Sequence, residues 1–494
     1  MSIAGTDECD KPDTTQIVQQ LDDFVTSSVE QAAGLHEFER GLLDRLLEIG
    51  RELTDRFLSR QGDGNLGETL KRDDATVHRS HDPNTRRLQT VFGQHAFPAY
   101  VYRCGRDEKS AIVLRPVDER LGIDPEKYSP LVKEFSMLLC TEHAFRPGAD
   151  VFETIFRQRL SVDTLERVSR AMGAQAGDFM DSLPTPNAKE EGELLVMTAD
   201  GKGVPMVRED AKKLRACDPK PDRPGNRRSA TVAAVYSIDC HVRTPEQILA
   251  ALFSSVESRS SDETPRPEPC HKRYTARFAQ VLPDLDKPAT GTQLAMVWAS
   301  RQVDERRRSG QKLVCIMDGQ HSLWDCAASS IGGIENPEMV EILDLLHVCS
   351  YIWKAAKALH ASRPEQEEFT LAKLTALLEG RVKSVIQSLR YLSTSRGLRG
   401  KKRKDVATAC GYFQSHQSRM KYNEYLAAGY PIATGVIEGA CRHIVKDRME
   451  RTGMKWTQLG ALSILNLRCL KASGMWNQFH KQRCKPNTRL QLNA

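Results

Sequence analysis

The stretch Leu194–Leu195–Val196–Met197–Thr198–Ala199–Asp200–Gly201–Lys202–Gly203 decides the fold of this chain. Its first six residues form a short uncharged run, which is typical of a strand buried in a sheet. Asp200 follows this run, and the glycine after it leaves space beside the carboxylate. A second run, Lys312–Met317, leads in the same way to Asp318 and Gly319. Both patterns predict a carboxylate that is held rigidly at the end of a strand and left open to a ligand.

A third acidic residue, Glu438, follows a Pro/Gly break in Tyr430–Pro431–Ile432–Ala433–Thr434–Gly435–Val436–Ile437–Glu438. It lies near the start of a helix predicted over 436–449, where the positive end of the helix dipole favours a carboxylate. Two divalent cations on oxygen ligands are the usual machinery for cutting and joining phosphodiesters. If the three acids converge, Asp200, Asp318 and Glu438 are suited to hold two Mg²⁺ or Mn²⁺ ions.

The totals indicate an ordinary soluble chain of several domains. It has 494 residues, too many for one hydrophobic core, with 40% hydrophobic and 28% charged residues. No stretch approaches the roughly 20 apolar residues that span a bilayer, and the first residues do not resemble a signal peptide. The 13 cysteines include no Cys-x-x-Cys pair, which favours reduced thiols. We expect a cytoplasmic, nucleoid-associated bacterial protein with no membrane partner.

Charge is distributed unevenly along the chain. The net charge is +6, yet the segment from Arg396 to Ala494 holds 19 Lys and Arg against 5 Asp and Glu, a net charge of +14. A strongly basic segment that also carries Glu438 favours a nucleic-acid partner over a solvated basic surface.

The N-terminal part is predicted to be mainly helical. Residues 1–87 are interpreted as a disordered start, helices between 15 and 60, and a polar loop over 61–87. The leucine stripe of these helices fits either a coiled-coil dimer contact or a packed helical hairpin, and its unsustained heptad favours the hairpin. Residues 88–188 are interpreted as a DNA-binding region. It holds a strand or hairpin over 91–103 and a candidate helix-turn-helix over 131–172, with a plain three-helix unit as the alternative.

The C-terminal part is predicted to be an α/β catalytic domain. Its first portion covers 189–350, a helical insertion with a basic loop covers 351–430, its last portion covers 431–480, and a basic tail covers 481–494. The expected order is a strand with an acid, further strands, a helix, a second strand with an acid, more helices, and a helix with a glutamate. This is the order of an RNase H-like mixed sheet flanked by helices and interrupted by an all-α insertion.

The amino-acid sequence of these segments resembles that of the DDE transposases of bacterial insertion sequences, most closely the ISKra family, which is related to the Mutator-like transposases. The resemblance runs from about Leu194 to Trp476 and more weakly from Val91 to Met172. It rests on these stretches: Thr198–Met206, Ile316–Gly319, Ile342–Val348, and, longest and most specific, Pro431–Trp456 with Lys446–Asp447–Arg448–Met449.

The resemblance implies that Asp200, Asp318 and Glu438 are the catalytic acids and the metal ligands. It also implies a role for the Asp344-x-x-His347 pair, because the family carries a similar pair between its second Asp and its Glu. His347 then contacts the scissile phosphate or positions water. The alternative is that Asp344 caps a helix and His347 is an ordinary histidine one turn later. Asp344 is also the rival of Glu438 as third metal ligand.

Cations near these acids are predicted to hold the DNA backbone. Arg442 and Lys446 follow Glu438 at spacings of four and eight, so they share roughly one helical face. Trp456 is interpreted as a core residue. The predicted DNA-binding residues are Lys202, Lys401, Lys402, Arg403, Lys404, Arg442, Lys446, Arg448, Arg451 and Lys455.

The sequence therefore predicts a DNA transposase that cuts transposon ends by two-metal chemistry and joins them to target DNA. Double-stranded DNA is the expected partner, and acting on two ends implies a homodimer or larger assembly. No ATP-binding motif of the Gly-x-x-x-x-Gly-Lys-Ser/Thr type is present, so no ATP is expected. The alternatives are a catalytically idle, transposase-derived DNA-binding regulator and an RNase H-like nuclease that cuts without joining.

Overall fold

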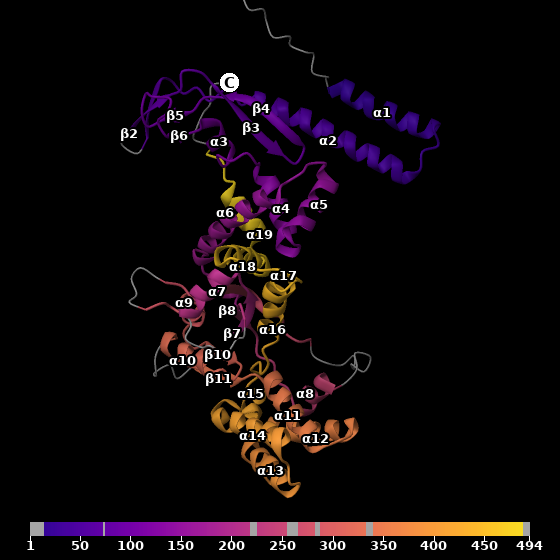
Figure 1. Cartoon of the computed structure of the whole chain (residues 1–494), viewed down its shortest axis with the longest axis vertical. Helices are drawn as coiled ribbons and strands as arrows, with labels where there is room; N and C mark the ends of the chain where they lie inside the picture. The colour runs from indigo at the N-terminus through magenta and orange to yellow at the C-terminus, as the bar shows by residue number, and fades with distance from the viewer. Residues whose placement is uncertain are drawn as a thin grey trace, which may run out of the picture. The chain divides into compact units, whose positions relative to one another are not determined.

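The computed structural model describes residues 14–72, 75–217, 225–253, 265–281, 287–331 and 339–487 (Figure 1). The chain forms two compact units: Met1–Val168 with Asn477–Ala494, and Ser169–Trp476. The finer boundaries expected at 87, 188, 350 and 430 stay predictions, and the expected disordered start lies outside the described residues. Among the described helices, none has the length and apolar character needed to cross a membrane.

The first unit mixes helices with small antiparallel sheets. A four-stranded sheet has the order β1-β2-β5-β6, and β3 pairs with β4 in a hairpin. The strands are β1 (Thr69–Arg72), β2 (Ala75–Arg79), β3 (Asn84–Thr90), β4 (Gly93–Ala99), β5 (Tyr102–Arg103) and β6 (Ile112–Leu114). The helices are α1 (Thr14–Glu30), α2 (Leu35–Ser59), α3 (Pro116–Leu121), α4 (Pro130–Glu142), α5 (Phe145–Phe156) and, at the end of the chain, α19 (Trp476–Arg483).

The prediction of a polar loop over 61–87 is wrong, because β1, β2 and the start of β3 lie in this region. Helix still exceeds strand among the described residues of the first unit, which is therefore mainly helical as predicted. The strands are short and charged, so they give no clear apolar alternation. Only Leu70 is a large apolar residue in β1, and the small core beneath the sheet is made by Val77, Tyr102 and Leu114. The predicted helices over 131–172 are confirmed as α4, α5 and the first half of α6 (Val162–Asp181), which runs nine residues further than expected.

The second unit is built on a five-stranded mixed sheet with the order β11-β10-β7-β8-β9. Its central strand β7 pairs antiparallel with β8, which pairs antiparallel with β9, while β10 and β11 run parallel to β7. The strands are β7 (Leu194–Pro205), β8 (Arg227–Ile238), β9 (Cys270–Arg277), β10 (Lys312–Met317) and β11 (Met339–Leu343). The strands and helices of the second unit thus follow one another along the chain in the predicted order.

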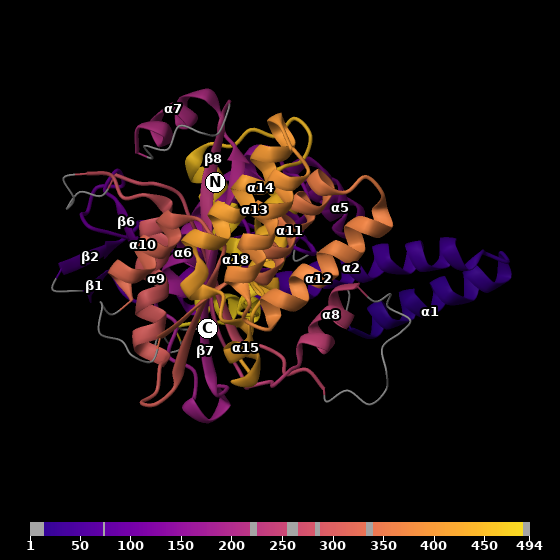
Figure 2. The same ribbon diagram turned by 90° about the horizontal axis from the view of Figure 1, so that it is seen from below.

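Helices cover both faces of this sheet, because its central strands are apolar on both sides. Leu194, Val196 and Ile316 pack against α11 and the helices after it, whereas Leu195 and Met197 pack against α9 and α10. Figure 2 shows the two sets of helices on either side of β7. These helices are α9 (Gly291–Arg306), α10 (His321–Ser330), α11 (Leu345–Leu359), α12 (Arg363–Leu378), α13 (Val382–Ser395), α14 (Gly400–Ser415) and α15 (Tyr422–Ala427).

Two expectations within the helical segment are corrected. The single helix expected over 369–391 is broken at Gly380, whose φ of 80° ends α12 before α13 begins. The expected basic loop is half helix, because Lys401–Lys404 form the first turn of α14. The remaining elements are η1 (Ala188–Glu190), α7 (Arg208–Cys217), α8 (Pro245–Phe253), η4 (Gln417–Arg419), α16 (Gly435–Ala440), the π-helical turn η5 (Cys441–Lys446), α17 (Asp447–Met449) and α18 (Gln458–Ala472).

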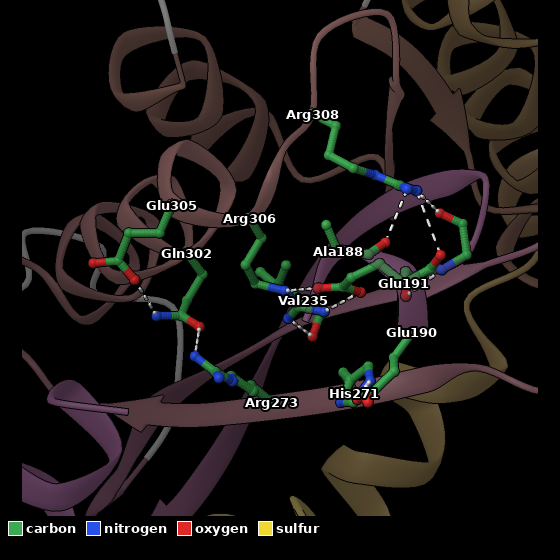
Figure 3. A network of polar contacts seen from close by, with 12 residues as sticks. Ala188, Glu190, Glu191, Val235, His271, Arg273, Gln302, Glu305, Arg306 and Arg308 are labelled. Carbon is green, nitrogen blue, oxygen red and sulfur yellow. Dashed lines mark hydrogen bonds and ion pairs between the residues drawn. The ribbon is translucent and has the colours of Figure 1, made fainter. Parts of the chain in front are cut away.

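A buried ion pair ties α9 to the start of β7 (Figure 3). Arg306 donates to both carboxylate oxygens of Glu191, at 2.8 and 3.0 Å, and to the carbonyl of Val235 at 3.2 Å. Arg308 donates to the carbonyls of Ala188 and Gly192, both at 2.9 Å. Burial acts to raise the pKa of Glu191, but hydrogen bonds from Arg306 and Ser237 outweigh burial and lower that pKa. The network therefore fixes where β7 enters the sheet.

We predict that Glu191→Gln destabilises the second unit by about 3–5 kcal/mol, because it leaves the Arg306 guanidinium buried without its counter-charge. Urea unfolding of the full chain measures this loss. Glu190→Gln is the matched control, since the side chain of Glu190 is 61% exposed and its removal should change stability by less than about 0.5 kcal/mol. Equal effects of the two changes would contradict the prediction.

Candidate active site

The register of three parallel strands places three aspartates in a row. Ala199 of β7 pairs with Met317 of β10, and Met317 pairs with Leu343 of β11. The next residues along these strands are Asp200, Asp318 and Asp344. Neighbouring strands lie about 4.8 Å apart, so these residues are successive neighbours across the sheet. They follow the even-numbered residues of each strand onto the face that α11 covers.

Asp344 is the innermost of the three and anchors the segment that carries Glu438. Its side chain is fully buried. One carboxylate oxygen accepts the backbone N–H of Thr434 at 2.8 Å, and the backbone N–H of Leu345 donates to the carbonyl of Ile432 at 3.0 Å. These bonds fasten the start of α16 beside the end of β11. Glu438 lies on α16, with its side chain 41% exposed.

His347 lies between Asp344 and Glu438. Its Nδ1 is 2.6 Å from the second oxygen of Asp344, which also accepts the His347 backbone N–H at 3.0 Å. The same Nδ1 is 3.9 Å from Glu438 Oε1. One ligand atom from each of the three residues lies within 4.8 Å of the others, a spacing compatible with a metal ion. Asp344 is thus a helix cap and the partner of His347 at once, so the two readings of this pair are not exclusive.

The charges of these residues act on one another. Burial raises the pKa of Asp318, and the negative charges of Asp200 and Asp344 raise it further. Burial likewise raises the pKa of Glu438, together with Asp344 and Asp200. The hydrogen bond to Asp344 raises the pKa of His347 to about 9, helped by Asp318 and Asp200. The structure therefore brings Asp200, Asp318, Asp344, His347 and Glu438 into one acidic cluster, which bound cations would stabilise.

Two neighbours of the cluster carried no signal in the sequence. Burial raises the pKa of the Cys441 thiol, at the start of η5, and the nearby carboxylate of Asp200 raises it further. This proximity becomes apparent only once β7 and η5 meet. Tyr412 of α14 lies against Gly319, directly after Asp318: a Cβ on Gly319 would stand 2.1 Å from the Tyr412 ring. Tyr412 also stacks on Tyr351 of α11 at 4.0 Å.

Most of the predicted DNA-binding residues are exposed. Lys401–Lys404 are exposed on the first turn of α14, as are Arg442, Lys446, Arg451 and Lys455 after Glu438. Lys202 is half-buried on β7, where its positive charge acts to lower the pKa of the Cys441 thiol.

The prediction that Arg448 binds DNA is wrong, because its side chain is fully buried. Its guanidinium lies 4.9 Å from the centre of the Trp456 ring. Trp456 is a core residue, as expected, and is 7% exposed.

Comparison with solved structures finds distant neighbours of this chain. No protein-family model matches the chain, and no curated protein matches it. Among solved structures, the chain is similar to a chain of the Drosophila P element transposase strand transfer complex, with a TM-score of 0.25 and 11% sequence identity. The match covers 74% of this chain and 84% of that chain. A likeness at this TM-score supports no argument about function.

We predict that Gly319→Ala destabilises the chain by about 1–3 kcal/mol, because the added methyl group displaces Tyr412 from its stack on Tyr351. In a Tyr412→Ala background the same change should cost much less, since the ring is gone. Urea unfolding of the four variants measures this coupling as a double-mutant cycle.

Gly411→Ala is the control, because a Cβ at Gly411 on the same helix meets nothing within 4 Å. Additive losses in the cycle, within about 0.5 kcal/mol, would show that Gly319 and Tyr412 do not depend on one another.

Proposed function

We propose that this chain is a DDE-type DNA transposase of the kind found in ISKra insertion sequences, with an RNase H-like catalytic domain. The observation that carries the proposal is the row of aspartates on β7 and β10, completed by Glu438 from a later helix. Adjacent parallel strands deliver two carboxylates side by side on one face of the sheet. The third comes from a segment that Asp344 fastens beside them.

Hydrogen bonding favours Glu438 over Asp344 as the third metal ligand. Both oxygens of Asp344 already accept protein donors, from Thr434 and from His347, and the side chain is fully buried. Glu438 is partly exposed and faces the same cluster. Asp344 therefore positions His347 and the segment that carries Glu438. Asp200, Asp318 and Glu438 would hold the metals.

The donor set suits two Mg²⁺ or Mn²⁺ ions, since it consists of carboxylates whose charges oppose one another. When bound, such ions activate the attacking water or 3′-hydroxyl and stabilise the leaving oxygen. His347 is held by Asp344 through Nδ1, which leaves Nε2 to contact the scissile phosphate. The thiol of Cys441 lies beside the carboxylate of Asp200. Tyr412 covers the chain just after Asp318.

The first turn of α14 is suited to bind the DNA backbone. Four consecutive cations, Lys401–Lys404, crowd the positive end of a helix dipole, where basic side chains are unfavourable. A polyanion next to them would relieve this repulsion and release its counterions. The arrangement favours a nucleic-acid contact at this helix end over a simple solvated surface.

We predict that Asp200→Asn, Asp318→Asn and Glu438→Gln each lower metal-dependent cleavage by about a hundredfold or more, since each removes a ligand worth several kcal/mol of transition-state stabilisation. The measurement is nicking of a labelled duplex taken from the DNA that flanks the reading frame, with Mg²⁺ or Mn²⁺ added. Binding of the same duplex should survive in each variant.

Asp325→Asn and Glu424→Gln are matched controls, because both residues are exposed on helices outside the acidic cluster. Cleavage that persists in the three cluster variants would overturn the assignment of these acids. DNA binding with no metal-dependent cleavage in the native chain would favour an idle regulator instead. Cleavage without joining of the 3′-end to a second duplex would favour a nuclease.

We predict that replacing Lys401, Lys402, Arg403 and Lys404 together by alanine weakens DNA binding at low salt and flattens its dependence on salt. Each lost phosphate contact lowers the slope of log affinity against log salt by about 0.9. Fluorescence anisotropy with a labelled duplex measures the slope between about 50 and 200 mM salt. Lys383→Ala/Lys421→Ala is the control, because both lysines are exposed in the same helical segment but lie outside the first turn of α14. An unchanged slope in the fourfold variant would contradict the prediction.

A further inference from the structure

Exposed apolar side chains are concentrated on the hairpin of α1 and α2. In the described part of the chain, 22 large apolar side chains are exposed, and this hairpin carries eight of them. They are Val18, Val25, Val29, Leu35, Leu43, Leu46, Leu53 and Phe57, with exposed fractions of 39 to 74%. Scattered apolar side chains are normal on a protein surface, but a contiguous apolar face marks an interaction site.

The hairpin is already paired on its inner side. Phe24 of α1 stacks on Phe38 of α2 at 5.5 Å, and the Arg45 guanidinium lies 3.7 Å from the centre of the Phe24 ring. The exposed residues are therefore not the seam between the two helices. The leucine stripe seen in the sequence serves two purposes: part of it closes the hairpin, and part of it remains uncovered.

The uncovered residues of both helices lie on one side of the hairpin. At 100° per residue, Val18, Val25 and Val29 stand about a third of a turn from Phe24. Leu35, Leu46, Leu53 and Phe57 stand about a quarter of a turn from Arg45, in the same rotational sense. Because the helices are antiparallel, equal rotations from their facing residues point to the same side. We call this surface, formed by these seven residues, the hairpin face.

The first 13 residues of the chain are a poor cover for this face. They contain only four apolar residues, Met1, Ile3, Ala4 and Cys9, set among charged and polar ones. Seven large exposed side chains need a larger apolar partner.

We propose that the hairpin face binds the hairpin face of a second copy of this chain, forming a two-fold symmetric four-helix bundle. The arrangement is self-complementary along α2. A two-fold axis between Ile49 and Gly50 sets Leu46 against the partner's Leu53. It sets Leu42 against the partner's Phe57, and Glu39 against the partner's Arg60. Glu39 and Arg60 are both exposed and lie at the two ends of the α2 stripe. A self-complementary patch is what a two-fold interface requires.

The size of the face fits a stable dimer. The 25 residues of α2 and the 17 of α1 give helices about 37 and 25 Å long, each about 10 Å wide. The hairpin face thus offers about 600 Å² from each copy, against about 800 Å² in a standard interface. Packing two apolar hairpins face to face is also the geometry of common four-helix bundles.

The test is the molar mass of the full chain in solution, measured by light scattering after gel filtration and by sedimentation equilibrium. The native chain should be a dimer at micromolar concentration. Leu46→Glu/Leu53→Glu should weaken dimerisation by at least about a hundredfold. These side chains are exposed in one copy, so the monomer should keep its fold and its helix content by circular dichroism. Val297→Glu, at a valine that is 60% exposed on α9, is the matched control and should remain a dimer.

Charge reversal tests the register. Glu39→Arg should weaken the dimer about tenfold, because the substituted arginine then faces the partner's Arg60 across the contact, and Glu39→Arg/Arg60→Glu should restore the dimer. A monomeric native chain, or a dimer unaffected by Leu46→Glu/Leu53→Glu, would overturn the proposal. These outcomes are separate from cleavage, so the proposal stands or falls independently of the transposase assignment.

Discussion

The parallel register between β7, β10 and β11 is the constraint on which the site depends. A shift of one residue in either pairing would turn an aspartate to the opposite face of the sheet, because strand side chains alternate. The register is held by two dry cores, one on each face. Leu194, Val196 and Ile316 pack on one side, and Leu195 and Met197 on the other. The apolar residues that build the sheet therefore also fix the spacing of its acids.

Asp344 converts this register into a three-dimensional site. Its carboxylate is fully buried, yet it accepts hydrogen bonds from Thr434 and from both the backbone and the ring of His347. A buried carboxylate is costly unless its oxygens accept hydrogen bonds. The Asp344 carboxylate and its donors therefore hold one another in place. One residue thereby positions the histidine and the glutamate-bearing helix relative to the sheet.

The sequence was sufficient to predict what local pattern controls, and it failed where distant residues decide. The strands ending at Asp200 and Asp318 were predictable because a short apolar run followed by Asp-Gly is a strong local signal. The strands over 69–90 were missed, since short charged strands lack alternation. Arg448 was misjudged because its burial under Trp456 depends on a turn that brings the two together. The contacts of Cys441 with Asp200 and of Tyr412 with Gly319 join residues far apart in the chain and left no local trace.

The hydrogen bond from Leu345 to Ile432 has a consequence for how such a chain can change in evolution. The helical segment α11 to α15 leaves the five-stranded sheet after β11 and returns beside it at almost the same point. Closing a loop whose ends already meet costs entropy that grows only with the logarithm of its length. The loops that join α12, α13 and α14 can therefore change in length at little cost to the folding of the sheet, provided that the buried faces of these helices still complete the core and that Asp344 still binds Thr434. The basic first turn of α14 and the acidic cluster are in this sense free to evolve at different rates.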